Sequence, residues 1–151
     1  FPRTVKIKVK ERVPAVYVNQ KNRFFIADSE GIVMGEVQSY RWNLPVVYGV
    51  DLHDIHFGEG PPPLSLRKAI EVRNQLALDP DLSKAPFLGI EVAAPGDIVL
   101  HFKETSVQLG QGDFPEKLKR LHEIEKEVEG QGIPLKEVDL RYGDQVVVRT
   151  L

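Results

Sequence analysis

The last fourteen residues constrain the fold most strongly, because they carry two consecutive strand patterns. In residues 138–142 (VDLRY) apolar side chains alternate with Asp139 and Arg141, which is the two-residue period of a half-buried strand. Residues 143–145 (GDQ) interrupt the pattern, and the β-branched run 146–148 follows. These features predict a β-hairpin. Such a hairpin is either covered by a neighbouring strand or leaves an edge free to pair with another chain.

Further strand patterns, each an apolar run or an alternation bounded by turn residues, are found at residues 4–10, 15–18, 24–27, 32–34, 87–94, 98–102 and 107–109. Residues 44–49 (LPVVYG) are also apolar but contain a proline, which favours an edge strand or a segment that leads into a strand.

Two helices are predicted from apolar residues at helical spacing. The first covers residues 65–78 with Ser65 as its N-cap, and the second follows a capping box of Asp113 and Glu116 and ends near Gly130 and Gly132. Strands outnumber helices, so we expect an α+β domain. Its mostly antiparallel sheet has two α-helices packed on one side and the C-terminal hairpin at its edge.

Composition excludes several classes of function. The 151 residues suit one domain, and the net charge of −2 with interspersed signs gives no electrostatic footprint for nucleic acid. The absence of cysteine rules out disulfides, zinc–thiolate sites and thiol catalysis. No apolar run approaches the roughly 18 residues of a membrane span, and there is no signal peptide. Phe1 stands where an initiator methionine would, so a fragment of a longer protein is expected.

One cluster resembles a metal site, the DLHDIH segment with Asp51, His53, Asp54 and His56. Two imidazoles and two carboxylates suit zinc or iron, and a metal-dependent extracytoplasmic hydrolase is the competing hypothesis. The segment lacks an HExxH-type helical pair and is polar, which favours solvated loop histidines instead.

Gly110 and Gly112 lie between a strand and a helix, as in a dinucleotide fingerprint. Pro115 occupies the position of the third glycine, and the surroundings are expected to be antiparallel, so a helix-entry turn is favoured. The charged residues that follow, including Lys117 and Glu127, indicate a solvated helix face. No catalytic constellation and no cofactor site is found.

The terminal hairpin carries residue types that dominate interface hot spots, Arg141 and Tyr142. They adjoin Val146, Val147 and Val148, whose strand is a candidate free edge. The alternative is that the hairpin belongs to the core, with Tyr142 buried and Arg141 paired with Asp139 or a helix acid. The residues alone leave both readings open.

Five pieces of the chain, taken in order, resemble the FtsQ/DivIB family of bacterial cell-division proteins. The matching stretches are FPRTVKIKVKERVPAV, FFIADSEGIVM, LPVVYG, VQLGQGDFPEKLKRL and VDLRYGDQVVVR. They resemble the end of a POTRA domain with its ER-x-P junction, a strand with Asp and Gly, an LP-x-x-x-G element, an LG-x-G-x-x-x-x-KL stretch and the near-terminal signature. Family members often have Gly where this chain has Gln145, which leaves the turn type and the register of the last strand open.

The resemblance implies residues 1–11 as the last strand of a truncated POTRA domain and residues 12–151 as an extracytoplasmic β-domain. It implies a single-pass protein of the inner membrane at the division septum, anchored by a missing N-terminal helix. Such a protein is a non-enzymatic scaffold that recruits FtsB and FtsL and helps to control septal peptidoglycan synthesis. Partner binding by strand addition is implied for Arg141, Tyr142, Val146, Val147, Val148 and Arg149. A POTRA-associated assembly factor with other partners is a further alternative.

Overall fold

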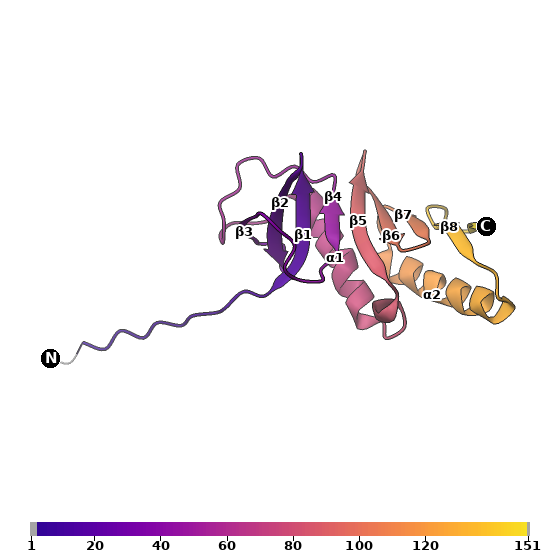
Figure 1. The fold of residues 1–151 in the computed structure, drawn as a ribbon, viewed down its shortest axis with the longest axis horizontal. Coiled ribbons are helices and arrows are strands. Elements are labelled where there is room, and N and C mark those ends of the chain that lie inside the picture. The colour runs from indigo at the N-terminus through magenta and orange to yellow at the C-terminus, as the bar shows by residue number, and fades with distance from the viewer. Residues whose placement is uncertain (1–2, 151) are drawn as a thin grey trace.

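The computed structural model describes residues 3–150, in which one sheet carries both α-helices on the same face (Figure 1). The strands are β1 (Pro14–Gln20), β2 (Arg23–Asp28), β3 (Val33–Val37), β4 (Val46–Tyr48), β5 (Phe87–Ala93), β6 (Asp97–Phe102), β7 (Ser106–Gly110), β8 (Leu135–Asp139) and β9 (Val147–Thr150). The helices are α1 (Leu64–Leu78), the short 3-10 helix η1 (Leu82–Lys84) and α2 (Phe114–Gln131). The expected α+β class is confirmed.

The nine strands lie in the order β3-β2-β1-β4-β5-β6-β7-β8-β9. Antiparallel pairs predominate, but β1 with β4, β4 with β5, and β7 with β8 are parallel. Of the two alternatives for residues 44–49, the edge strand is wrong, because β4 is paired on both sides, whereas Leu44 and Pro45 do lead into β4. Pro45 is tolerated because it precedes the first strand residue, and its carbonyl accepts a hydrogen bond from the Tyr17 N–H at 2.9 Å.

Both α-helices connect parallel strands. α1 leads from β4 to β5 and α2 leads from β7 to β8, so each is the crossover of a βαβ unit. The expected antiparallel surroundings of Gly110 and Gly112 are therefore wrong. Sequence patterns distinguish strand from helix but do not report strand direction, which the crossover decides.

One apolar cluster fills the space between the helices and the sheet. It joins buried side chains of α1 and α2, such as Leu66, Ile70 and Leu121, to strand residues such as Val16 and Ile90. Burial of these side chains supplies most of the stabilising free energy, because each contributes about 1.5–3 kcal/mol relative to an exposed position.

The helix starts differ from the predicted caps. Ser65 lies inside α1, whose N-cap position is held by Pro63, and neither Pro63 nor Asp113 makes a side-chain cap hydrogen bond. Asp113 adopts a left-handed conformation with φ 50°, which does not provide the extended backbone that a capping box requires. Gly132 ends α2 in the left-handed conformation, as expected for a C-cap glycine.

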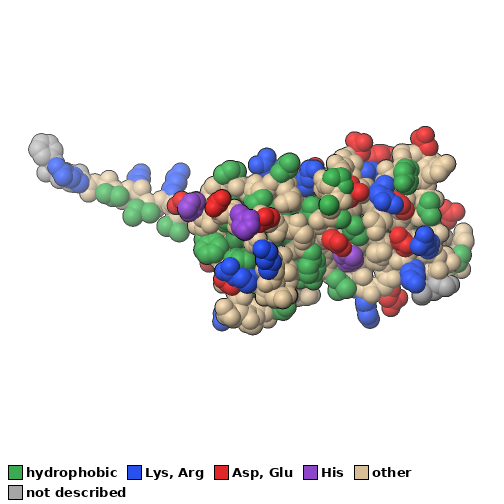
Figure 2. Space-filling model, turned by 90° about the horizontal axis from the view of Figure 1, so that it is seen from above, with side chains coloured by type: hydrophobic (Ala, Val, Ile, Leu, Met, Phe, Trp, Pro, Cys, Tyr) green, Lys and Arg blue, Asp and Glu red, His purple; other side chains and the backbone are tan. Residues whose placement is uncertain are grey.

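Residues 3–13 form an extended arm that projects from the sheet (Figure 1, Figure 2). The strand predicted at residues 4–10 is not formed, because no neighbouring backbone lies beside the arm to complete a ladder. Val5, Ile7 and Val9 are between 79% and 86% exposed. Residues 1 and 2 of the predicted POTRA strand lie outside the described residues.

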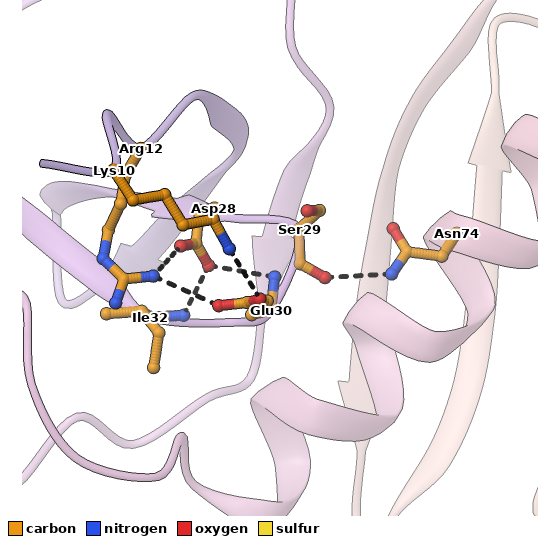
Figure 3. A network of polar contacts seen from close by, with 7 residues as sticks. All are labelled: Lys10, Arg12, Asp28, Ser29, Glu30, Ile32 and Asn74. Atoms are coloured by element: carbon orange, nitrogen blue, oxygen red, sulfur yellow. Dashed lines mark hydrogen bonds and ion pairs between the residues drawn. The ribbon is translucent and has the colours of Figure 1, made fainter. Parts of the chain in front are cut away.

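The end of the arm is fixed to the turn between β2 and β3 (Figure 3). Arg12 Nη1 donates to Asp28 Oδ2 at 2.6 Å and to Glu30 at 3.2 Å, and the backbone N–H groups of Glu30 and Ile32 donate to Asp28 Oδ1 at 2.9 Å each. Burial acts to raise the pKa of Asp28, but these donors outweigh it and hold that pKa below its usual range. The turn is thus held by an ionised, buried carboxylate.

Candidate functional site

The last strand, β9, lies at one edge of the sheet, as the sequence predicts. Its four residues are all exposed, and it pairs only with β8. The backbone groups of β9 that point away from β8 have no strand beside them within residues 3–150. Gln145 in the turn therefore does not prevent the strand from taking the edge position.

The register of β8 and β9 decides where the side chains of β9 point. Val148 lies opposite Val138, which is fully buried, so Val148 faces the helix side of the sheet together with Val146, which packs against the core. Val147 lies opposite Asp139 on the other face and is 48% exposed. On that face Arg149 pairs with Glu137 at 3.3 Å.

Arg141 lies in the loop between the strands rather than on a strand. β8 ends at Asp139, whose Oδ1 accepts a hydrogen bond from the Arg141 N–H at 3.0 Å and so turns the chain. The guanidinium donates to both carboxylate oxygens, at 3.0 Å from Nε and 2.7 Å from Nη2. This bond lowers the pKa of Asp139 and raises the pKa of Arg141, so the pair is charged throughout the physiological range.

Tyr142 follows in the same loop and is 58% exposed. The Arg141 guanidinium carbon lies 5.7 Å from the centre of its ring, within the range of a cation–π contact. Arg120 of α2 donates to the Gly143 carbonyl at 3.0 Å and ties the loop to the helix. The alternative in which the hairpin belongs to the core made two predictions. Its Arg141–Asp139 pair is correct, whereas its buried Tyr142 is wrong, because Tyr142 is exposed.

The end of β7 forms the floor beneath Arg141. Gly110 has φ 68°, and a Cβ at this position would lie 2.9 Å from Arg141 Cγ, so only glycine leaves room for the arginine stem. Lys117 is 8% exposed, and its Nζ donates to the carbonyls of Leu109 at 2.7 Å and Gln111 at 2.9 Å. The assignment of Lys117 to a solvated helix face is therefore wrong. Its helical phase beside Leu118 and Leu121 is the signal that indicates burial.

The DLHDIH segment does not form a metal centre. Asp51 accepts hydrogen bonds from Gln20 Nε2 at 2.8 Å and from the His53 N–H at 3.2 Å, and its side chain is 66% exposed. Ligand atoms of Asp51, His53, Asp54 and His56 are not gathered at one point within residues 3–150. The hydrolase hypothesis has no geometric support.

Among residues 3–150 one other group, Asp79, Asp81 and His122, has ligand atoms within 4.8 Å of one another. The two ring nitrogens of His122 face different carboxylates, with Nδ1 3.3 Å from Asp79 and Nε2 3.6 Å from Asp81. Lys126 also approaches Asp81, at 3.8 Å. This arrangement is an ion-pair network that joins α2 to the loop after α1.

The profile of the FtsQ/DivIB C-terminal domain, described as "Cell division protein FtsQ/DivIB, C-terminal", matches residues 15–141. The chain therefore belongs to the FtsQ/DivIB family of cell-division proteins, and the resemblance noted from the sequence is confirmed.

Relatives of known name agree with this membership. The chain is 27% identical over 161 aligned positions to cell division protein FtsQ of Geobacter sp. (strain M21), covering 99% of this chain and 55% of the relative. It is 26% identical over 133 positions to FtsQ of Anaeromyxobacter sp. (strain K), covering 87% and 45%. The chain thus spans about half the length of the curated relatives it matches.

A solved structure of the major extracytoplasmic domain of the cell-division protein DivIB from Geobacillus stearothermophilus can be aligned with this chain. The alignment covers 81% of this chain and 98% of the solved structure. The TM-score is 0.49 and the sequence identity 17%. Within residues 3–150, neither α-helix combines the length and the apolar character that a bilayer crossing requires.

Proposed function

We propose that this chain is the extracytoplasmic part of a divisome scaffold without enzymatic activity, which binds FtsB and FtsL by strand addition at β9. The observation that carries the proposal is the unpaired outer edge of β9, with its four exposed residues beside the Arg141–Tyr142 loop. Through this contact the protein helps to control septal peptidoglycan synthesis. Family membership supports the divisome role.

The energetics suit a reversible contact. A partner strand along four residues gains about four main-chain hydrogen bonds at roughly 0.5–1.5 kcal/mol each, or about 2–6 kcal/mol in all. Loss of the partner's freedom opposes this gain, so side chains must supply the margin. Tyr142, held by Arg141, and the exposed Val147 are placed to do so. Val146 packs against the core and acts by positioning the strand.

The proposal extends to the surroundings of the domain. Residues 1–11 complete the last strand of a POTRA domain when the rest of that domain lies beside them, and residues 12–151 are the β-domain. The whole is a single-pass inner-membrane protein with this part outside the cytoplasm. The uncovered apolar side chains of Val5, Ile7 and Val9 support this division, because such a pattern calls for a neighbouring sheet.

Amide hydrogen exchange on the domain, with and without the soluble parts of FtsB and FtsL from the same organism, tests the assignment. We expect amides of residues 147–150 to become protected on binding while those of β3 do not change. A Glu127→Lys variant, altered on the exposed face of α2, should bind as the wild type does. Protection at β3, or binding with no protection at either edge, would contradict the proposal.

A further inference from the structure

A second surface with the features of a binding site lies where α1 ends and β5 begins. Figure 1 shows the positions of these two elements in the sheet. It is an open cavity of about 490 Å³, within the range of about 300–1,000 Å³ that is usual for ligand sites. Nine of its thirteen lining residues are apolar, but polar atoms contribute at least as much of the exposed lining. These residues come from the segment before β4, the last turns of α1, η1 and the start of β5. Its apolar lining residues include Leu44, Phe87 and the exposed Leu88, together with the buried Leu76 and Leu82.

The charges in this cavity have one sign. Arg73 and Lys84 are the charged residues that line it, and within residues 3–150 neither pairs with a carboxylate. Arg73 donates only to the neighbouring Asn74 side chain, at 3.2 Å. A cavity of mixed lining with two cations at its wall complements a ligand that carries a carboxylate beside an apolar group.

The rim of the cavity is apolar and held in place. Leu88 is 55% exposed and also borders a second cavity, of about 550 Å³, which Tyr48 lines. Residues 38–45 before β4 are fixed because the buried Tyr17 hydroxyl accepts hydrogen bonds from the N–H groups of Arg41, at 2.8 Å, and Trp42, at 3.0 Å. Trp42 is 45% exposed beside Asn43, a lining residue. Preorganised exposed aromatic side chains are typical of protein interfaces.

We propose that this cavity binds an acidic peptide segment of a partner protein that also carries apolar side chains. An apolar side chain of the segment fills the space beside Leu76 and Leu88, and a carboxylate pairs with Arg73 and Lys84. Since β4 and β5 are paired on both sides, the segment binds through side chains and not by strand addition. The site shares no residue with the β9 edge.

Two synthetic hexapeptides test this inference, acetyl-Leu-Glu-Leu-Glu-Leu-Glu-amide and its counterpart with glutamine in place of glutamate. Trp42 is the single tryptophan of the chain, so its fluorescence reports binding at the neighbouring cavity. We expect the acidic peptide to bind about tenfold more tightly than the glutamine peptide at low ionic strength. The combined variant Arg73→Gln/Lys84→Gln should remove this preference, and Leu88→Ser should weaken both peptides.

The matched control is Arg67→Gln/Lys119→Gln, which removes two exposed cations outside the cavity and should keep the preference. Val147→Pro, which alters the β9 edge, should also keep the preference for the acidic peptide. A loss of FtsB binding at β9 and a loss of peptide binding at this cavity are therefore separate results. Equal affinity for the two peptides, no saturable binding of either, or equal loss in the control variant would overturn the inference.

Discussion

The two edges of the sheet differ in how far they are closed. At the β3 edge, the Val33 carbonyl accepts a hydrogen bond from Gly58 at 2.8 Å, so the loop after β4 covers part of the strand. The pairing of β2 with β3 is shifted at Ile26 and Ala27, and Gly35 lies in the middle of β3. At the β9 edge, four exposed residues follow one another, and no segment among residues 3–150 covers them in this way.

Bulges, glycines and covering loops are the features by which proteins prevent unwanted strand pairing. β3 has all three. The pairing of β9 also has one register shift, between Leu135 and Glu137 of β8, but β9 itself presents Val147 and Val148 beside an oriented arginine and an exposed tyrosine. The difference indicates which edge is available to a partner. The experiments below alter one edge or its support and use the rest of the molecule as the control.

Proline at the β9 edge should have the largest effect. Successive N–H groups of a strand point to opposite sides, so one of Val147→Pro and Val148→Pro removes an outward donor and the other a bond to β8. We expect at least one variant that stays folded by circular dichroism and binds FtsB with about 100-fold lower affinity in calorimetry, which is about 2.7 kcal/mol. Met34→Pro on β3 should change the affinity less than twofold. The reverse pattern would assign the contact to β3.

Removal of the buried cation beneath the Arg141 loop should come next. Lys117→Met leaves the carbonyls of Leu109 and Gln111 without their donor, so we expect the free energy of unfolding to fall by about 2 kcal/mol in urea titrations. Lys119→Met, at an exposed position of the same helix, should change it by less than about 0.5 kcal/mol. Similar losses for both variants would show that Lys117 has no special structural role.

Truncation of the exposed tyrosine should weaken partner binding without loss of stability. Tyr142→Ala removes an aromatic anchor, and we expect about tenfold weaker FtsB binding with an unchanged urea midpoint. Tyr48→Ala, which removes another half-exposed tyrosine from the centre of the sheet, is the control and should leave this affinity unchanged. Equal effects of the two variants would argue against a local contact at β9.

The β3 side should be sensitive to acid through Asp28. Folding lowers the pKa of Asp28, so its contribution is fully present above about pH 4, where the unfolded-state carboxyl is ionised, and is lost as the pH falls through the folded-state pKa. Asp28→Asn should therefore reduce the free energy of unfolding by about 1 kcal/mol at pH 7 and by less at pH 2. Urea titrations at both pH values measure this; an equal loss at both would contradict the ionised role.

The smallest expected effect is a difference in FtsB affinity between alanine variants of two neighbouring glycines. Gly110 and Gly112 both have positive φ, of 68° and 65°, so alanine strains the backbone at either position. A Cβ at Gly110 also collides with Arg141, whereas at Gly112 no atom lies within 4 Å. We expect Gly110→Ala to bind FtsB about threefold more weakly than Gly112→Ala. Equal affinities would mean that the position of the Arg141 side chain against Gly110 is not needed for FtsB binding.

Much of the fold could be predicted from the sequence. The hairpin of β1 and β2, the pair of β5 and β6 and both helices follow from periodicity and turn residues, whereas the edge position of the last strand was favoured by the family resemblance. Helix caps were predicted less well. A side chain of the right type at the right spacing forms a cap only if the backbone before it is extended, and at Asp113 it is left-handed.

The candidate site was predicted in part. Val147, Val148 and Arg149 do lie on an exposed edge strand, but the preceding strand covers residues 135–139, three positions earlier than the alternation suggested. Its bounds are set by parallel pairing with β7, a partner about thirty residues away in the chain. Local alternation in VDLRY continues past the point where Asp139 turns the chain, so Arg141 and Tyr142 looked like strand residues.

The sequence by itself determined the elements, the apolar face of each helix and the family to which the chain belongs, because these depend on local patterns and on motifs in order. Only the tertiary structure decided which edge is open, that β4 is central and that Lys117 is buried, because each depends on which distant segments lie side by side. The same contacts place Arg141 between the Asp139 carboxylate and Gly110, and thereby present Tyr142 beside the last strand.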